Sequence, residues 1–555
     1  MDELQELVTH NSHGGREATG PAALPPMTPK LELTVDEVID EYVGSLGFSQ
    51  LIHVFLVSLA WVFDSQNTLV TIFSDAKPSW ACKGGGSWCD PGSTGSVCKV
   101  ESGHWEWIRG NGSSTIAEWG IICDRKFYAG IPASLFFLGS ILGSAAYGCL
   151  AGSYLGRKRA VLVSCLLTSI TAFLTSFSPN VWIYALLCFS NGFAWSGIGI
   201  CCFVLSTEVI GRKWRGQVGQ YGFFFFTTGF LSLSLIAYPN RTSWRNIYKI
   251  ISLLPFLYSI LILPFVSESP RWLIVRGRNK EALQILNKLA RLNGKKLPQN
   301  LTISNSSTNM NESVSTKSLW SARWAAKRML TVMIAGFGVG FLYYGIQLNV
   351  ENLNLDLYFT VVLNALVEIP AVLIGIVLLS FTDRRLLISS SAYIAGVSCI
   401  LCIFFSRKNT GNKEQVEGEA KNNWPQLTME AIGIMAASKV FDVLYIFCVE
   451  LFPTNVRNFA VSMLRQALML GASIAPLLVV LGRLSPSLSF LAFGALGIFS
   501  GLVIIWLPET RNAPLYETLE QQEEEKLASF SNLGVELESI EVVSVWYSHP
   551  LLASM

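Results

Sequence analysis

Charged side chains are scarce in this chain of 555 residues. Only 14% of its residues are Asp, Glu, Lys or Arg and 51% are hydrophobic, whereas soluble proteins carry about 25% charged residues. The formal net charge is +2 and no dense basic tract occurs, so we expect no nucleic-acid partner. With five histidines and no H-E-x-x-H or Walker A pattern, we expect no metal, no cofactor and no enzymatic activity.

Cysteine is distributed unevenly. Of the twelve cysteines, eight lie in apolar runs, where a small buried side chain is the usual role. The other four, Cys82, Cys89, Cys98 and Cys123, share a polar loop over residues 74–126, which indicates an oxidising compartment on that side. They allow at most two disulfides, in three alternative pairings. We expect a disulfide-linked cap that is structural rather than substrate-binding.

Twelve apolar runs approach the ~20 residues that a helix needs to cross a bilayer. We therefore predict an all-α membrane protein with twelve transmembrane helices as six plus six. The predicted spans are 48–73, 127–150, 160–177, 181–205, 218–238, 244–266, 329–348, 358–380, 386–405, 428–451, 459–481 and 488–507. The implied organisation is an N-terminal segment 1–47, a first bundle 48–267, a linker 268–327, a second bundle 328–508 and a tail 509–555.

The N-terminal segment has its own pattern. Residues 33–45 are typical of a short amphipathic helix capped by Thr34. The first 47 residues hold no apolar core of the kind found in a cleavable signal peptide.

Lys and Arg in the short loops fall on one side of the predicted bundle, together with the linker and both termini. This side is therefore predicted to face the cytoplasm. The cysteine loop then lies outside, which agrees with the redox inference. Asn111 and Asn240 begin N-x-S/T sequons on that outer side and are candidate glycosylation sites.

Two motifs repeat at one spacing. Glu208 and Arg215 recur as Glu450 and Arg457, 242 residues later, and Glu268 recurs as Glu509, 241 residues later. A common offset indicates a duplicated architecture. Arginines also lie in the loops between helices 2 and 3 and between helices 8 and 9. They could form charged latches between adjacent helices, or they could serve only as signals of membrane topology.

These motifs resemble the major facilitator superfamily. The loop at 148–159, the two Glu-x6-Arg repeats and Glu268-Ser-Pro-Arg-Trp-Leu carry that resemblance. The long cysteine-bearing loop and Glu450-Leu-Phe-Pro-Thr-Asn-Val-Arg-Asn are similar to the organic ion transporter family, most closely its plant organic cation/carnitine transporters, over about residues 33–515. In this sequence Gly152 and Ser153 replace the acid and the arginine usual in the helix 2–3 motif.

The resemblance implies a cytoplasmic charge network that holds the two halves closed on that side and reforms as they rock about a central site. Its members would be Arg157, Glu208, Arg215, Glu268, Arg271, Asp383, Arg384, Glu450, Arg457 and Glu509.

Ionisable residues inside the spans are candidate functional residues. Asp64 lies in helix 1, Glu368 in helix 8, and Lys439 and Asp442 in helix 10. Lys439 and Asp442 could simply neutralise each other at i, i+3, and Asp64 could instead cap a helix end. By resemblance Glu368 matches a glutamate of the substrate pathway, as cation partner or proton carrier.

Helix 11 carries Arg465, which could hold the carboxylate of a zwitterion. It lies one turn before Met469, which aligns with the charge-selecting position of the family. The aromatic residues Tyr221, Phe223–Phe226, Phe341, Tyr343 and Tyr344 could supply a cation–π cage, although most of the Phe run must face lipid or core. By resemblance Tyr343 matches a pathway tyrosine, and Gly336 stands where cation carriers place a tryptophan.

We predict secondary active transport of small organic cations or zwitterions such as carnitine. Coupling to protons is a hypothesis that rests on the acids within the spans. A sugar or organic anion carrier of the same fold is one alternative, and a non-transporting membrane receptor or scaffold is another. The expected form is a monomer in the plasma or vacuolar membrane, because plant relatives occur in both. The solute and the direction of transport stay open.

Overall fold

The computed structural model describes residues 31–83, 97–101, 103–153, 155–298, 300–303, 319–350, 356–411, 424–483, 486–511 and 519–524. Within these ranges, twelve helical segments are long and apolar enough to cross a membrane, as predicted from the sequence. Their apolar side chains surround each helix, as expected for helices that contact both lipid and neighbouring helices.

The first bundle begins with one span made of three short helices. Its elements are α2 (Phe48–Ser58), α3 (Ala60–Leu69), α4 (Thr71–Ser74), η4 (Cys123–Gly130), α7 (Ile131–Ser153), α8 (Arg157–Thr175), α9 (Val181–Thr207), η5 (Arg212–Trp214), α10 (Arg215–Ala237), α11 (Trp244–Leu261) and η6 (Leu263–Phe265). The second bundle comprises α15 (Arg323–Leu348), α16 (Leu357–Phe381), α17 (Arg384–Gly411), α18 (Trp424–Leu451), α19 (Thr454–Gly482) and α20 (Pro486–Ile504).

Polar residues begin several of these helices. The side chain of Asn180 accepts hydrogen bonds from the main-chain N–H of Ile183 at 2.9 Å and of Trp182 at 3.1 Å at the start of α9. Asp356 likewise accepts from Phe359 at the start of α16. Such caps satisfy the N–H groups that the first helical turn leaves without partners.

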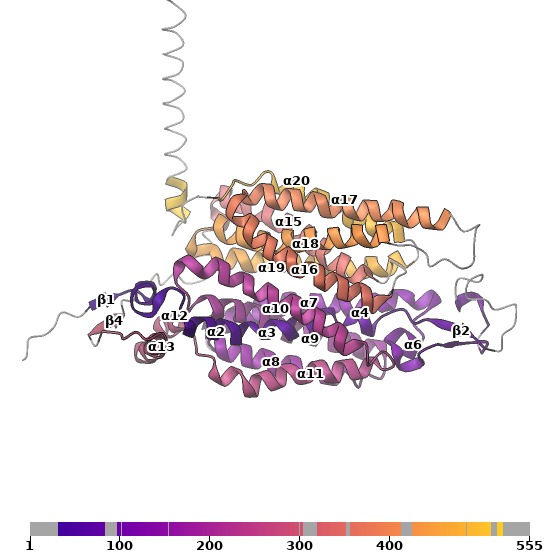
Figure 1. Ribbon diagram of the computed structural model, residues 1–555, viewed down its shortest axis with the longest axis horizontal. Coiled ribbons are helices and arrows are strands. Elements are labelled where there is room, and N and C mark those ends of the chain that lie inside the picture. The colour runs from indigo at the N-terminus through magenta and orange to yellow at the C-terminus, as the bar shows by residue number, and fades with distance from the viewer. Residues whose placement is uncertain are drawn as a thin grey trace, which may run out of the picture.

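The two bundles repeat the same helix pairings. α3 packs against α10 as α15 packs against α19, and α8 packs against α9 as α17 packs against α18. The bundles meet along α7 with α19 and along α10 with α16. Figure 1 shows them side by side, the first in indigo to magenta and the second in orange to yellow.

The linker and the N-terminal segment form a small subdomain at one end of the bundles, which we call the linker face (Figure 1). β1 (Leu31–Leu33) pairs in parallel with β4 (Leu301–Ile303). Around this pair lie α1 (Val35–Glu37), η1 (Val38–Gly44), α12 (Pro270–Val275) and α13 (Asn279–Leu292), which bury residues such as Ile39 and Leu286. Thr34 caps α1 through a capping box with Glu37. Two segments that the sequence analysis keeps separate thus share one core.

The opposite end, the loop face, carries the cysteine loop. β2 (Trp80–Cys82) pairs with β3 (Trp105–Trp107). η2 (Val97–Lys99) lies between these strands in the chain, and η3 (Asn111–Ser113) and α6 (Thr115–Trp119) follow β3. A disulfide joins Cys98 to Cys123. Cys82 is also disulfide-bonded, and Cys89 lies outside the described residues.

The loop docks on the first bundle through α6. The ring of Trp119 lies 5.5 Å from Tyr184 and 5.6 Å from Trp244. Glu118 pairs with Arg245 at 2.6 Å. Of the two sequons, Asn111 is exposed in η3, while the side chain of Asn240 donates a hydrogen bond to the carbonyl of Ile236.

We expect Gly192→Leu to destabilise the protein, because α7 and α9 touch there. A Cβ on Gly192 would lie 1.9 Å from the carbonyl oxygen of Phe136, and overpacking costs about 1–3 kcal/mol. Gly148→Leu on α7 is the control, since nothing lies within 4 Å of its Cβ position. Thermal unfolding should show a lower midpoint for Gly192→Leu alone. Equal midpoints would contradict this packing.

Candidate functional site

Glu368 is a carboxyl buried in α16, with 2% of its surface exposed. Its Oε1 accepts hydrogen bonds from the hydroxyls of Tyr343 at 2.8 Å and Ser438 at 2.9 Å. The amide of Gln347 donates to Oε2 at 3.4 Å. Asp442, one turn after Ser438, is also buried and close enough for its charge to interact with that of Glu368. Two carboxyls in an apolar interior are costly unless donors, protons or a cation compensate.

An aromatic cluster adjoins this carboxyl pair through Tyr343. The ring of Tyr343 lies 4.8 Å from that of Phe441 and 5.1 Å from that of Tyr344. Tyr344 in turn lies 4.8 Å from Phe137 of α7, and Phe441 lies 6.4 Å from Phe223 of α10. The aromatic cluster therefore spans the interface between the bundles, and its faces can attract a cation.

A second charged group lies at the same interface. The guanidinium of Arg465 on α19 lies 5.6 Å from the ring centroid of Trp195 on α9 and packs against Gly199. Asp64 on α3 is buried and interacts electrostatically with Arg465. Among the described residues, neither Asp64 Oδ1 nor Arg465 Nε has a hydrogen-bond partner. Tyr445 lies beside Arg465 and connects this group to the aromatic cluster.

Not every candidate from the sequence joins these groups. Tyr221 on α10 is 47% exposed, on a surface made largely of apolar side chains, and so does not face the carboxyl pair. Met469 is buried one turn beyond Arg465. Lys439 and Asp442 are both described and form no ion pair with each other, so mutual neutralisation has no support.

Three acidic residues with notable surroundings are not among the predicted site residues. Glu430 in α18 is buried and accepts a hydrogen bond from Asn364 at 3.4 Å. Asp75 is buried at the loop face, and Asp36 of α1 pairs with Arg215 of the first bundle and Arg271 of the linker. Glu430 and Asp75 lie close to the ends of apolar runs, where a charge looks interfacial, and Asp36 looks like the polar face of an amphipathic helix.

The charge network of the first bundle surrounds the start of α8. Glu268 accepts hydrogen bonds at 3.0 Å from the main-chain N–H groups of Arg157 and Lys158. A carboxylate is favoured at this position because the first N–H groups of a helix have no partner within it. The guanidinium of Arg157 pairs with Glu208 at 3.3 Å and donates to the carbonyl of Ala151.

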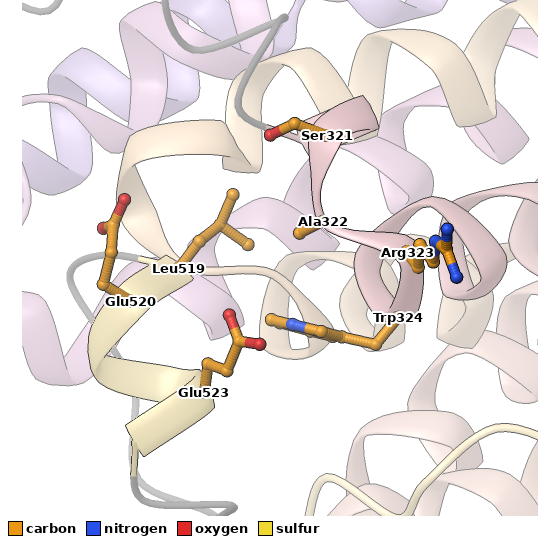
Figure 2. Close-up of a pocket in the computed structure, with 7 residues that line it drawn as sticks. All are labelled: Ser321, Ala322, Arg323, Trp324, Leu519, Glu520 and Glu523. Carbon is orange, nitrogen blue, oxygen red and sulfur yellow. The ribbon is translucent and has the colours of Figure 1, made fainter.

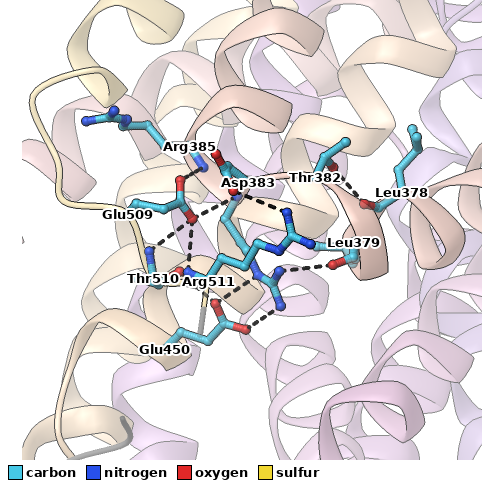
Figure 3. A network of polar contacts seen from close by, with 10 residues as sticks. Leu378, Leu379, Thr382, Asp383, Arg385, Glu450, Glu509, Thr510 and Arg511 are labelled. Carbon is cyan, nitrogen blue, oxygen red and sulfur yellow. Dashed lines mark hydrogen bonds and ion pairs between the residues drawn. The ribbon is translucent and has the colours of Figure 1, made fainter. Parts of the chain in front are cut away.

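The second bundle repeats this arrangement at the start of α17 (Figure 3). Glu509 accepts hydrogen bonds from the main-chain N–H groups of Arg384 at 2.9 Å and Arg385 at 3.0 Å. Arg384 pairs with Glu450 at 3.2 Å and donates to the carbonyl of Leu379. The duplication indicated by the sequence thus extends to individual hydrogen bonds.

The N-terminal segment makes the two networks unequal. Asp36 pairs with both Arg215 and Arg271. Arg457, the counterpart of Arg215, donates to the carbonyl of Phe452, and its Nη2 has no partner within the described chain. In the second bundle, Asp383 pairs with Arg511 at 3.4 Å. The pairs of Arg157 and Arg384 each lie within one bundle, so a latch across the bundles stays a prediction.

The bundles also touch at the loop face. Phe73 stacks on Tyr358 of α16, with ring centroids 5.3 Å apart. Arg483, which follows α19, donates a hydrogen bond to the main-chain carbonyl of Asp75 at 3.1 Å. The loop face is therefore closed in this conformation.

Two cavities lie at opposite ends of the molecule. One of about 40 Å³ lies between the bundles at the loop face, next to Asp75 and Arg483. The other, of about 550 Å³, lies at the linker face between the start of α15 and the helical turn at 519–524 (Figure 2). Trp324 and Glu523 line it, and none of the predicted transport residues does.

The sequence matches the family described as "Sugar (and other) transporter" over residues 98–521. It is 40% identical to "Organic cation/carnitine transporter 2" of Arabidopsis thaliana, over 88% of this chain and 94% of that protein. It is 39% identical to "Organic cation/carnitine transporter 3" of the same plant, over 90% and 96%. "Solute carrier family 22 member 3" of Rattus norvegicus is 32% identical, over 76% and 74%.

Solved structures are similar in fold. The inward-open xylose transporter XylE from E. coli superposes with a TM-score of 0.58 at 15% identity, over 83% of this chain and 97% of that chain. Its partially occluded inward-open form gives a TM-score of 0.56 at 16% identity, over 85% and 100%. At such low identity these structures support the arrangement of twelve helices alone.

We expect Glu509→Gln to destabilise the protein in a pH-dependent way. Burial raises the pKa of Glu509, but four main-chain N–H donors outweigh it and hold this pKa below its ordinary value. A carboxyl whose pKa is lower in the folded state stabilises the protein at pH values above its unfolded-state pKa of about 4.3. This stabilisation is lost as the pH falls through the folded-state pKa. The thermal midpoint should drop at pH 7 and approach that of the wild type near pH 3. Glu520→Gln, at an exposed site, is the control, and equal loss at both pH values would refute this role.

Proposed function

Because the chain belongs to the major facilitator superfamily and, within it, to the organic ion transporter family, we propose that it is a secondary active transporter of small organic cations or zwitterions such as carnitine. The solute would bind between the two bundles, which would open alternately to the two sides of the membrane.

The observation that carries this proposal is the buried carboxyl of Glu368 within an aromatic cluster at the bundle interface. A quaternary ammonium group has no N–H to donate, so charge attraction and aromatic faces are the means by which a protein can bind it. Glu368 and Asp442 supply the negative charge, and Tyr343, Tyr344 and Phe441 supply the faces. The names of the plant relatives point to the same class of solute.

The zwitterion part of the proposal rests on Arg465. Its guanidinium adjoins the same aromatic cluster, with Tyr344 and Tyr445 near it. A solute with an ammonium group and a carboxylate could satisfy both charged groups at once, whereas a simple cation would use Glu368 alone. The same guanidinium is the observation that favours the alternative of an organic anion as solute.

Proton coupling is a further part of the proposal. Glu368 holds three hydrogen bonds from neutral donors and faces a second carboxyl, Asp442. Like charges so close in an apolar interior favour one shared proton. With one proton bound, the pair would keep one negative charge for a cation, so a proton and the solute would be carried together.

The linker face is proposed to be cytoplasmic, because the short loops there are rich in Lys and Arg. The closed loop face would then correspond to a conformation that faces inward. The protein is proposed to act as a monomer in the plasma or vacuolar membrane, with both termini in the cytoplasm.

Glu368→Gln should reduce uptake of labelled tetraethylammonium into proteoliposomes by about tenfold or more, since a charged interaction worth about 1.5–3 kcal/mol is removed. Asp356→Asn makes the same chemical change at the exposed start of α16, where Asn can still cap the helix, and should leave uptake unchanged. Uptake should also rise with an inward proton gradient in the wild type. Full activity of Glu368→Gln would refute the cation site.

Arg465→Gln should separate the two classes of solute. We expect it to weaken carnitine uptake by about tenfold, because a carboxylate loses a charged partner, while tetraethylammonium uptake stays within about twofold. Competition with unlabelled hexoses and dicarboxylates should have no effect on the wild type. Equal loss for both solutes would show that Arg465 is needed for the structure rather than for zwitterion binding. Strong competition by an anion or a sugar would favour those alternatives, and flux of no solute would favour a receptor or scaffold.

A further inference from the structure

Asp75 is a buried carboxyl that ties three parts of the loop face together. It follows α4 directly, one residue beyond the first span, and is 6% exposed. Its Oδ1 accepts hydrogen bonds from the hydroxyls of Thr115 at 2.7 Å, Tyr184 at 3.0 Å and Ser74 at 3.3 Å. These donors come from α6, α9 and α4. Its Oδ2 is buried and has no hydrogen-bond partner among the described residues.

Asp75 also lies where the two bundles meet. Arg483 of the second bundle donates to its main-chain carbonyl at 3.1 Å. Both residues line the cavity of about 40 Å³ between the bundles, together with Gly130 at the end of η4 and Pro476 of α19. A Cβ on Gly130 would lie 3.0 Å from the carbonyl oxygen of Pro476, so the chains are in close contact. Separation of α19 from the first bundle would expose Asp75 to water.

We propose that Asp75 is a proton-binding residue of the loop-face gate, and that a proton on its carboxyl favours the closed gate while its release favours opening. The proposal rests on the proposed function in one respect, namely that the loop face opens during transport. It assigns a proton site separate from Glu368, at the entrance rather than in the middle of the membrane.

The direction follows from the change in surroundings. Burial raises the pKa of Asp75 to about 7 in the closed conformation, although the hydroxyl donors and the charge of Arg483 oppose this. Exposure to water would return the pKa toward its ordinary value of about 3.9. The closed gate therefore binds the proton more tightly, so acid stabilises it and alkali favours opening. The other ionisable groups that face Asp75 are Tyr184 and Cys188 of α9 and Tyr248 of α11, all neutral at pH 7 by their ordinary pKa values.

An ion-pair gate would respond in the opposite direction. If attraction between Arg483 and an ionised Asp75 were the main force that holds the bundles together, a proton would remove that attraction and acid would open the loop face. The sign of the pH response therefore separates the two mechanisms, and it needs no knowledge of the solute.

The test is the labelling rate of a cysteine at Ala129, which is buried against Val480 of the second bundle. Ala129→Cys is placed in a Cys149→Ser background, since Cys149 is an exposed thiol in the described part of the chain. The purified protein in lipid nanodiscs is treated with a maleimide. Each rate is divided by that of Cys149 in the unsubstituted protein at the same pH, which corrects for thiol reactivity.

From pH 8 to pH 6 the corrected rate should fall about tenfold, as expected for a closed-state pKa near 7. Asp75→Asn should label slowly at both pH values, and Asp124→Asn, at an exposed site on the same face, should behave like the wild type. Thr115→Val removes a donor to the carboxylate and should move the midpoint to higher pH, which tests the proposal even if Asp75→Asn does not fold. A rate that is independent of pH, or that rises with acid, would overturn the proposal. Because no solute is present, failure of transport would leave this result interpretable.

Discussion

A carboxyl group in the apolar interior of a membrane protein requires compensation, and much of this structure supplies it. Glu368 is held by donors from α15 and α18 and faces a second carboxyl. The hydrogen bonds reduce the cost of desolvation without removing the charge, whereas the second carboxyl adds to that cost. The site can therefore bind a positively charged group that neutralises the remaining negative charge. A proton on one carboxyl and an organic cation beside the other would do so together, and their joint binding would couple their movements.

The same constraint shapes the ends of the bundles. At the linker face, Glu268 and Glu509 neutralise the free N–H groups at the starts of α8 and α17, in equivalent positions of the two halves. At the loop face, Asp75 is buried by contact between the halves. A change in the contact between the bundles would therefore alter the surroundings of Asp75. This provides a physical link between proton binding and the conformation of the protein.

The fold could be predicted because hydropathy and motif spacing are local properties. The predictions fail where a property depends on more than the local sequence, as for the end of a helix, its rotation, or a partner far away in the chain. α17 continues to Gly411 although the apolar run ends near 405, because a helix can extend into water with its backbone bonds intact. Tyr343 and Glu368 were both identified, and the structure joins them at 2.8 Å. The predicted cation–π cage wrongly includes Tyr221, because sequence alone does not give the rotation of a helix in lipid. Asp36 was missed because its partner Arg215 lies 179 residues away.

The central claim is that this protein moves small organic cations or zwitterions between two bundles. Uptake of labelled tetraethylammonium and carnitine into liposomes that contain the purified wild-type protein tests it most directly. The account predicts saturable uptake of at least one of them, inhibited by other quaternary ammonium compounds and stimulated by an inward proton gradient. Absence of uptake of both, together with saturable uptake of a hexose or a dicarboxylate, would contradict the substrate assignment while leaving the fold intact.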